Sequence, residues 1–271
     1  MASATLVIAG AGEGKTGLLT YFVKTEYFEN GHELRRNCCE YLTRLNKNRS
    51  TPFELPEDPP IYTDTTDYKV RFKVGWEKWF ETYAICPYYM GATDGNRPTQ
   101  YVLPYSIIAI PEIQKYADSR LGSKFPRALS RIFEIRRHLH LKFLMDGHRG
   151  SFIDLKVRAM CDRVIDLQKQ EHDRDELGRI VRTRWYCKEY KSIAKYEEGT
   201  DYVETVYTNE GNIFDDYDSF GCASELIPPD GVQFSTYKHM SYAEAQKTLP
   251  PDQARFFNPN EPKGWRTNGE K

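Results

Sequence analysis

The chain has no apolar run of the roughly 20 residues that a membrane-spanning helix needs. Its longest apolar stretch, residues 104–111, has the length of a strand. It also lacks a strong charge of either sign. The formal net charge is −1, which excludes a general basic coat for nucleic acid but permits a local basic channel. The chain has no internal repeats, and its 271 residues suffice for one large α/β domain, alone or with an appendage.

Cysteine is sparse, and no two cysteines have C-x-x-C spacing. The six cysteines are Cys38, Cys39, Cys86, Cys161, Cys187 and Cys222. Their even number allows a disulfide framework, but the chain shows no signal peptide. We therefore expect reduced, mostly structural cysteines in a cytoplasmic protein.

Glycine gathers in the most informative stretch, residues 4–20. A short apolar run, Leu6 to Ile8, leads into a glycine-rich turn that ends in Gly14-Lys15-Thr16 and continues as a helical pattern. The order strand, glycine-rich loop, helix is typical of a phosphate-binding loop, because its backbone N–H groups and the helix N-terminus surround phosphates. The strict motif has glycine where this chain has Ala9, a common variant. The alternative is a glycine-rich turn with a chance Gly-Lys-Thr.

This loop predicts a site for ATP and Mg²⁺. Lys15 would place its charge on the β- and γ-phosphates, and the Thr16 hydroxyl would bind the metal ion. The predicted nucleotide-binding residues are Ala9, Gly10, Ala11, Gly12, Glu13, Gly14, Lys15, Thr16 and Gly17.

Hydrophobic patterning predicts an α/β fold, a P-loop NTPase with a mostly parallel central sheet flanked by helices. The run Ser106 to Ile110 is apolar throughout, as for a buried parallel strand that ends near Glu112. The expected helices are 14–29, 32–47, 125–140 and 152–160, with a stop at Asn30-Gly31 between the first two. The other expected strands are 59–64, 68–74, 141–145 and 163–167, and residues 76–94 are expected to be irregular.

After residue 170 the pattern changes to the alternation of antiparallel strands, at 178–187 and 202–208. We therefore predict a P-loop ATPase domain over 1–228, made of a core (1–170) and an antiparallel β extension (171–228). Residues 229–271 hold few aliphatic side chains and are predicted to form a loosely structured tail.

Several stretches together resemble one family. Residues 103–120 resemble its second nucleotide motif, in which an apolar strand ends in Asp-Glu-Ala-Gln and a Ser-Arg pair follows. Residues 133–158 resemble its Arg-His helix, next strand and Ile-Asp segment, and residues 212–219 resemble its late Tyr-Asp-Ser/Thr motif. In the order of these motifs over residues 4–220, the chain resembles the zonula occludens toxin-like phage ATPases. That family is similar to FtsK/HerA-type motors.

The resemblance implies a phage-encoded motor of virion assembly, DNA packaging or extrusion, often hexameric. It implies that Glu112 polarises the attacking water and that His148 senses the γ-phosphate. It also implies an arginine donated by a neighbouring subunit. The predicted catalytic residues are Lys15, Glu112, His148 and Arg120, with Arg137 and Arg149 as other candidates for that arginine. Some family members carry a membrane anchor, and its absence here favours a soluble role in the host cytoplasm.

Two residues depart from the family pattern. Pro111 stands where the family has the Asp that orients the magnesium shell, and His148 stands where it has Gln. Proline has no carboxylate, so either hydrolysis is impaired or another group serves. Asp146, Asp64 and Glu13 are the candidate acids.

Some candidate residues have a plain structural alternative. Glu112 could cap a following helix instead of acting on water. The Arg/His-rich face of 127–140 could contact DNA phosphates or simply face solvent. His138 and His140 lack a third ligand at metal-binding spacing, which argues against a metal site there.

The first functional prediction is a ring of subunits that couples ATP hydrolysis to DNA packaging, DNA translocation or virion assembly, with ATP and DNA as partners. One alternative is a non-catalytic nucleotide-binding virion protein, which Pro111 favours. The other is a nucleotide or small-molecule kinase, for which the Arg-rich helix is an imperfect lid and the β-rich C-terminal region is unfavourable.

Overall fold

The computed structural model describes residues 2–64, 68–87, 101–120, 127–148 and 150–218, with the isolated positions 243, 246 and 247. By its internal contacts the chain divides into two compact units, Met1–Cys222 and Ala223–Lys271. The first unit contains all the elements described below. Arg149, Cys222 and the predicted tail, apart from positions 243, 246 and 247, lie outside the described residues, and the domain boundary at 228 stays a prediction.

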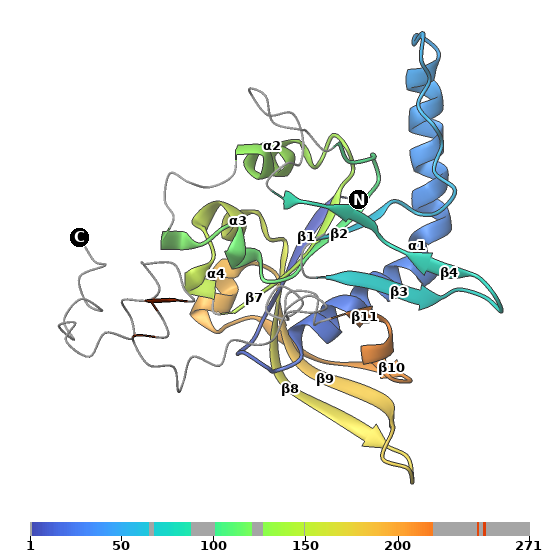
Figure 1. Ribbon diagram of the computed structural model, residues 1–271. Helices are drawn as coiled ribbons and strands as arrows, with labels where there is room; N and C mark the ends of the chain where they lie inside the picture. The colour runs from blue at the N-terminus through green and yellow to red at the C-terminus, as the bar shows by residue number, and fades with distance from the viewer. Residues whose placement is uncertain are drawn as a thin grey trace. The chain divides into compact units, whose positions relative to one another are not determined.

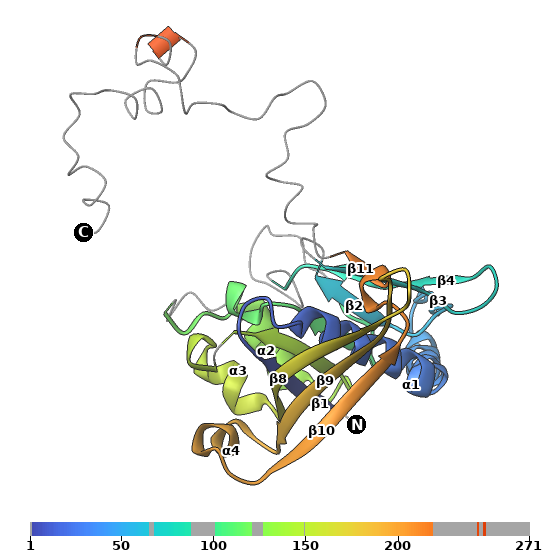
Figure 2. The ribbon, with the colours of Figure 1, turned by 90° about the horizontal axis from the view of Figure 1, so that it is seen from below.

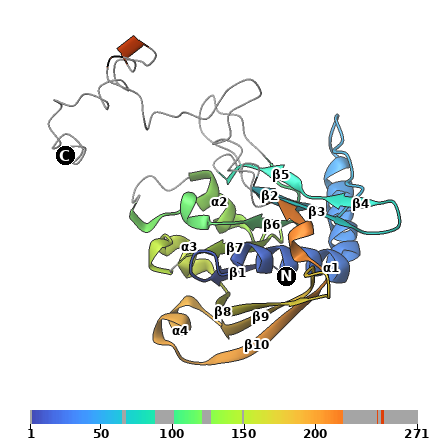
Figure 3. The ribbon, with the colours of Figure 1, turned by 60° about the horizontal axis from the view of Figure 1, so that its bottom comes forward.

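An eight-stranded sheet forms the centre of the first unit, in the order β10-β9-β8-β1-β7-β6-β2-β5 (Figure 1; Figure 3 shows the strands side by side). These strands are β1 (Ser3–Ile8), β2 (Ile61–Asp64), β5 (Tyr83–Ile85), β6 (Ile107–Ile110), β7 (Lys142–Gly147), β8 (Arg163–Arg174), β9 (Ile180–Tyr190) and β10 (Tyr202–Glu210). Pairing is parallel from β8 through β5, and antiparallel from β8 through β10. The predicted fold class is therefore confirmed.

Helices cover both faces of this sheet, because its central strands are apolar on both sides. Side chains that alternate along β1 enter different cores: Val7 packs with Leu18 and Leu19 of α1 (Lys15–Asn46), whereas Leu6 and Ile8 face the opposite side. That opposite side is covered by α2 (Arg127–Ile135) and α3 (Leu155–Met160). The short helix α4 (Ile193–Glu198) connects β9 to β10, and these long strands extend the sheet (Figure 2).

A second, three-stranded sheet has the order β11-β3-β4. Its strands are β3 (Lys69–Lys73), β4 (Trp79–Glu81) and β11 (Tyr217–Asp218). The prediction that residues 76–94 are irregular is wrong where the structure describes them, since β4 and β5 lie there. Each of these strands has three residues, and only Phe80 and Ile85 are buried in them, so no period-two pattern is long enough to be recognised.

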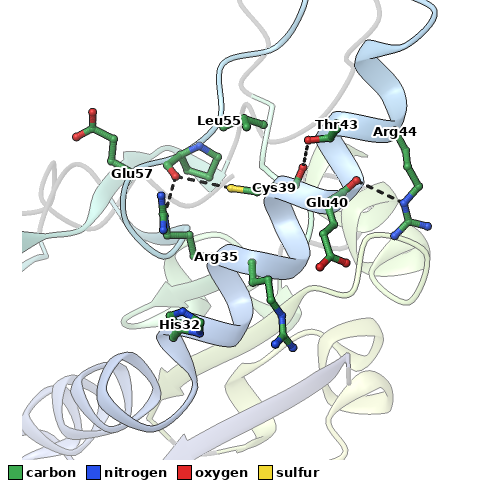
Figure 4. Close-up of a pocket in the computed structure, with 10 residues that line it drawn as sticks. His32, Arg35, Cys39, Glu40, Thr43, Arg44, Leu55 and Glu57 are labelled. Carbon is green, nitrogen blue, oxygen red and sulfur yellow. Dashed lines mark hydrogen bonds between the residues drawn. The ribbon is translucent and has the colours of Figure 1, made fainter.

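The predicted stop at Asn30-Gly31 is also wrong, because α1 is one helix of 32 residues. Gly31 is buried, and a Cβ at this position would lie 2.9 Å from Cγ of Pro59. Glycine is therefore needed for the close approach of the loop before β2, rather than to end the helix. Figure 4 shows α1 changing direction near His32, after which its second half projects from the sheet (Figure 1).

The segment 125–140 is helical only in part, since α2 ends at Ile135. The Arg136 side chain is buried and donates hydrogen bonds to the carbonyls of Phe133 and Met160. The Leu141 N–H donates to the Arg136 carbonyl, so the chain turns into β7. Arg136 thus belongs to the interior, and the predicted cationic face loses one of its members.

Cys38, Cys39, Cys161 and Cys187 are free thiols. Burial raises the pKa of Cys38, Cys161 and Cys187 to about 12, so these three thiols stay protonated and unreactive near neutral pH. None of the helices in the described ranges has the length and apolar character needed to cross a membrane.

Candidate nucleotide-binding site

The phosphate loop joins the carboxyl end of β1 to the N-terminus of α1. Gly12 and Gly14 have φ of 76° and 88°, in the left-handed region that favours glycine. The loop is also reached by a side chain from β8, because a Cβ on Gly14 would lie 2.3 Å from Oε1 at the flexible end of Gln170. No local pattern around Gln170 indicates that its side chain reaches the loop. In the sheet β1 lies between β7 and β8. Because the loop follows the carboxyl end of β1, it lies at the edge where parallel sheets bind ligands.

Lys15 is the first residue of α1 and is directed back into the loop. Its side chain is 6% exposed, and its Nζ lies 2.7 Å from the Gly10 carbonyl oxygen and 3.3 Å from Nδ1 of His148. Because the ammonium can only donate, Nδ1 of His148 accepts and the imidazole carries its proton on Nε2. The predicted sensor histidine therefore lies directly beside the predicted phosphate lysine.

Glu13 closes the loop on itself. Its carboxylate accepts a hydrogen bond from the Gly10 N–H, a backbone donor of the kind that binds phosphate oxygens. The side chain is exposed at the loop surface. The Glu13 carboxylate is therefore held by the backbone of the loop itself.

Asp146 lies at the carboxyl end of β7 and is fully buried. Its Oδ1 accepts a hydrogen bond of 2.8 Å from the Glu112 N–H, and its Oδ2 lies 3.5 Å from the Thr16 hydroxyl oxygen. Burial raises the pKa of Asp146 to about 6, although the Glu112 N–H and the charge of Lys15 act to lower it. The strand β7 thus places a buried carboxyl between the phosphate loop and the end of β6.

Glu112 follows Pro111 directly after β6 and has a φ of 46°, a strained value for a non-glycine residue. Its Oε2 forms an ion pair of 3.0 Å with Lys115, and its Oε1 lies 3.9 Å from Nε2 of His148. A chain of polar contacts therefore connects Lys15, His148 and Glu112. Three of the four predicted catalytic residues meet at one edge of the sheet.

The fourth, Arg120, is not part of this cluster. Its side chain is 76% exposed and is held by Asp118, whose pKa the Arg120 hydrogen bonds lower to about 2. Arg137 precedes β7 and so lies at the opposite edge of the sheet, where parallel strands begin. The structure does not place Arg137 near the loop. Arg120 remains the predicted arginine for a neighbouring subunit.

Asp64, the third candidate acid, ends β2 and is buried, and it accepts a hydrogen bond from the Tyr116 hydroxyl. In the order of strands, β7 and β6 separate β2 from β1 and its loop. Among the described residues, no group of three or more His, Cys, Asp or Glu side chains is arranged to hold a metal ion. A magnesium ion would depend on the phosphates for ligands, as this ion commonly does.

A groove of about 770 Å³ lies on the second half of α1 and the loop after it (Figure 4). Its lining mixes charges, with Arg35, Arg36 and Arg44 beside Glu40 and Glu57. It begins at His32, 17 residues along α1 from Lys15, or roughly 25 Å at the helical rise. This groove is therefore separate from the phosphate loop.

Comparison with known proteins finds likeness in structure only. No protein-family model and no curated protein matches the chain. The chain is similar to the N-terminal domain of zonular occludens toxin from Neisseria meningitidis. The identity is 13% and the TM-score 0.43, with 80% of this chain and 100% of that domain covered. This is the family that the sequence motifs resemble.

Two further likenesses are to viral packaging enzymes. The DNA-packaging ATPase B204 from Sulfolobus turreted icosahedral virus has 12% identity and a TM-score of 0.30, covering 78% of this chain and 100% of that one. The genome packaging NTPase B204 from Sulfolobus turreted icosahedral virus 2, in complex with ATP-gammaS, has 10% identity and a TM-score of 0.32, with 78% and 98% covered. At these scores the roles of residues have to be argued from the site itself.

Proposed function

We propose that this protein is a P-loop ATPase that binds ATP with Mg²⁺ at residues 9–17 and hydrolyses it. The observation that carries the proposal is the buried Lys15 ammonium, held inside a glycine loop at a helix N-terminus and next to His148. A buried cation at such a place is favourable mainly if an anion joins it. Phosphate is the anion that this loop geometry accommodates.

Each residue of the cluster has a role in this proposal. Lys15 would exchange the Gly10 carbonyl for phosphate oxygens, and the loop N–H groups would bind the remaining oxygens. The Thr16 hydroxyl would hold magnesium, which neutralises phosphate charge. Glu112 would orient the attacking water, and His148 would contact the γ-phosphate. Water then forms the new bond to phosphorus, and the bond to the ADP oxygen breaks.

Two observations favour the non-catalytic alternative. The Glu112 carboxylate is paired with Lys115, and Pro111 brings no acid to the end of β6. A protein with these features could bind ATP tightly without turning it over. Nothing described in the structure favours the kinase alternative, since the Arg-rich segment is partly turned into the interior through Arg136.

Binding and turnover of ATP separate these alternatives. We expect the protein to bind a fluorescent ATP analogue in the presence of Mg²⁺ and to release inorganic phosphate from ATP. Turnover that rises on addition of DNA supports the motor proposal. Tight binding without phosphate release favours the structural alternative, and absence of any nucleotide binding contradicts the proposal as a whole.

We also propose DNA as the partner of the ATPase, and the β3–β4 hairpin is the surface that best fits it. Lys69, Arg71 and Lys73 alternate along the exposed face of β3. The Arg71 and Lys73 cations lie 4.7 and 5.4 Å from the centre of the Trp79 ring, and Trp76 at the hairpin tip is 91% exposed. Cations interleaved with exposed aromatic rings suit a single strand, because phosphates pair with the cations and bases stack on the rings.

Replacing both hairpin tryptophans, Trp76→Ala with Trp79→Ala, is expected to weaken binding of a single-stranded oligonucleotide about tenfold or more. Each base stacked on an aromatic ring contributes roughly 1–3 kcal/mol. Fluorescence anisotropy at fixed salt measures the change. The control is Arg179→Gln, an exposed cation on the β8–β9 hairpin. Equal weakening by both variants, or none by the first, would contradict the assignment.

A ring of subunits, often six, follows from the family resemblance and stays a proposal. Arg120 is exposed at the carboxyl edge of the sheet, the same edge as the phosphate loop, which suits a residue that acts on a neighbour. Size-exclusion chromatography with light scattering, with and without ATP, measures the oligomeric state. A monomer under all conditions would contradict the ring.

A further inference from the structure

We infer that Asp146, at the end of β7, supplies the carboxylate of the magnesium site in place of the acid that Pro111 removes from the end of β6. The inference rests on the proposed function, since it concerns the metal that accompanies ATP. It names a residue on a different strand from the one on which the family resemblance places this acid.

Strand register places Asp146 beside Pro111. Ile110 of β6 pairs with Met145 of β7, so the next residues, Pro111 and Asp146, are level on neighbouring strands. Neighbouring strands lie about 4.8 Å apart. On its other side Asp146 pairs with Val7 of β1, the strand that leads into the phosphate loop. Asp146 therefore places a carboxylate on β7, one strand closer to the loop than the position of Pro111 on β6.

The side chain faces the correct side of the sheet. Leu144, two residues earlier on β7, packs in the core beneath α1, together with Val7 and Ala109. Because side chains alternate along a strand, Asp146 points to the α1 side as well. Its Oδ2 lies 3.5 Å from the Thr16 hydroxyl oxygen, so a carboxylate and a hydroxyl meet at the N-terminus of α1. Such hard oxygen ligands are those that magnesium prefers.

The burial of Asp146 is only partly compensated by the charge of Lys15, since the pKa of Asp146 stays raised to about 6. The carboxyl is fully buried, and among the described residues its close polar contacts are the Glu112 N–H and the Thr16 hydroxyl. Burying a carboxylate is costly unless a cation or several donors stabilise it. A divalent cation between Asp146, Thr16 and the phosphates would supply that stabilisation. The Glu112 N–H meanwhile fixes the orientation of the carboxyl by binding its other oxygen.

The other two acids have different partners. The Glu13 carboxylate is engaged by the Gly10 N–H on the exposed side of the loop. Asp64 accepts a hydrogen bond from the Tyr116 hydroxyl at the end of β2, two strands beyond β7. Asp64 is as buried as Asp146, which makes it the matched control for the experiment.

Asp146→Asn keeps the size of the side chain and removes its charge. Calorimetric titration with ATPγS, in Mg²⁺ and in EDTA, gives the factor by which magnesium tightens nucleotide binding. We expect Asp146→Asn to lower the affinity in Mg²⁺ by about 10- to 100-fold, the usual cost of losing a supporting metal contact. Affinity in EDTA should be unchanged. Asp64→Asn should keep the full magnesium effect.

A compensating variant guards against a purely structural role. Pro111→Asp combined with Asp146→Asn returns a carboxylate to the end of β6 and should recover magnesium-dependent binding and Mn²⁺ binding measured by electron paramagnetic resonance. If folded Asp146→Asn keeps the full magnesium effect, the inference about Asp146 is wrong but the proposed function stands. The same holds if Asp146→Asn loses the effect and the double variant does not recover it. If the wild-type protein binds no nucleotide in either buffer, the proposed function itself is wrong.

Discussion

Lys15→Ala is expected to lower the affinity for ATP by about 10- to 100-fold and to abolish measurable phosphate release. A hydrogen bond to a charged group contributes roughly 1.5–3 kcal/mol, and each 1.4 kcal/mol is a factor of ten in affinity. Lys15 is buried in the loop, where its ammonium donates to the Gly10 carbonyl. Binding of a fluorescent ATP analogue and a phosphate-release assay measure the two effects.

Lys24→Ala is the matched control, because it removes a lysine from the same helix. Lys24 forms an ion pair of 2.6 Å with Asp216 and is three-quarters buried, but it lies more than two helical turns from the loop. Its replacement should leave ATP binding within about twofold of wild type. If Lys15→Ala binds ATP as tightly as Lys24→Ala, the phosphate loop is not the nucleotide site.

Trp185→Ala is expected to lower the free energy of unfolding by about 3–5 kcal/mol, the usual cost of removing a large buried aromatic side chain. Trp185 lies on β9, is fully buried, and packs against Tyr21 of α1 with ring centres 5.5 Å apart. The Trp185 ring also lies over Gly17 of α1, since a Cβ placed on that glycine would be 3.5 Å from the ring. The antiparallel strands therefore support the start of the phosphate helix, and ATP affinity should fall together with stability.

Thermal unfolding measures this effect, and a loss of roughly 10 °C in Tm is expected for a chain of this size. Leu177→Ala, at the exposed tip of the β8–β9 hairpin, is the control and should change stability by less than about 0.5 kcal/mol. An unchanged Tm for Trp185→Ala would mean that the β8–β10 region is not integral to the α/β fold. That outcome would favour a domain boundary near residue 170, between the core and the β8–β10 region.

The glycine-rich loop between β1 and α1 could be predicted because all its parts lie within one short stretch of sequence. The glycines, Lys15 and the following helix are local features, and their backbone requirements do not depend on distant residues. The central parallel strands β1, β6 and β7 were equally recognisable, since strands buried on both faces are largely apolar. Two other features could not be predicted: the short strands β4 and β5, and the close packing of Gly31 on Pro59. Both depend on contacts with residues that are distant in the sequence.

The sequence by itself determined the fold class and the glycine-rich loop between β1 and α1, and it predicted the loss of an acid at Pro111. It also placed Asp146, Asp64 and Glu13 as equal candidates for the missing carboxylate. Only the tertiary structure brought Asp146 to the Thr16 hydroxyl, because the order of strands and the register of β6 with β7 decide which side chains become neighbours. Residues 111 and 146 are far apart in the chain but level on adjacent strands, and no local pattern records that pairing.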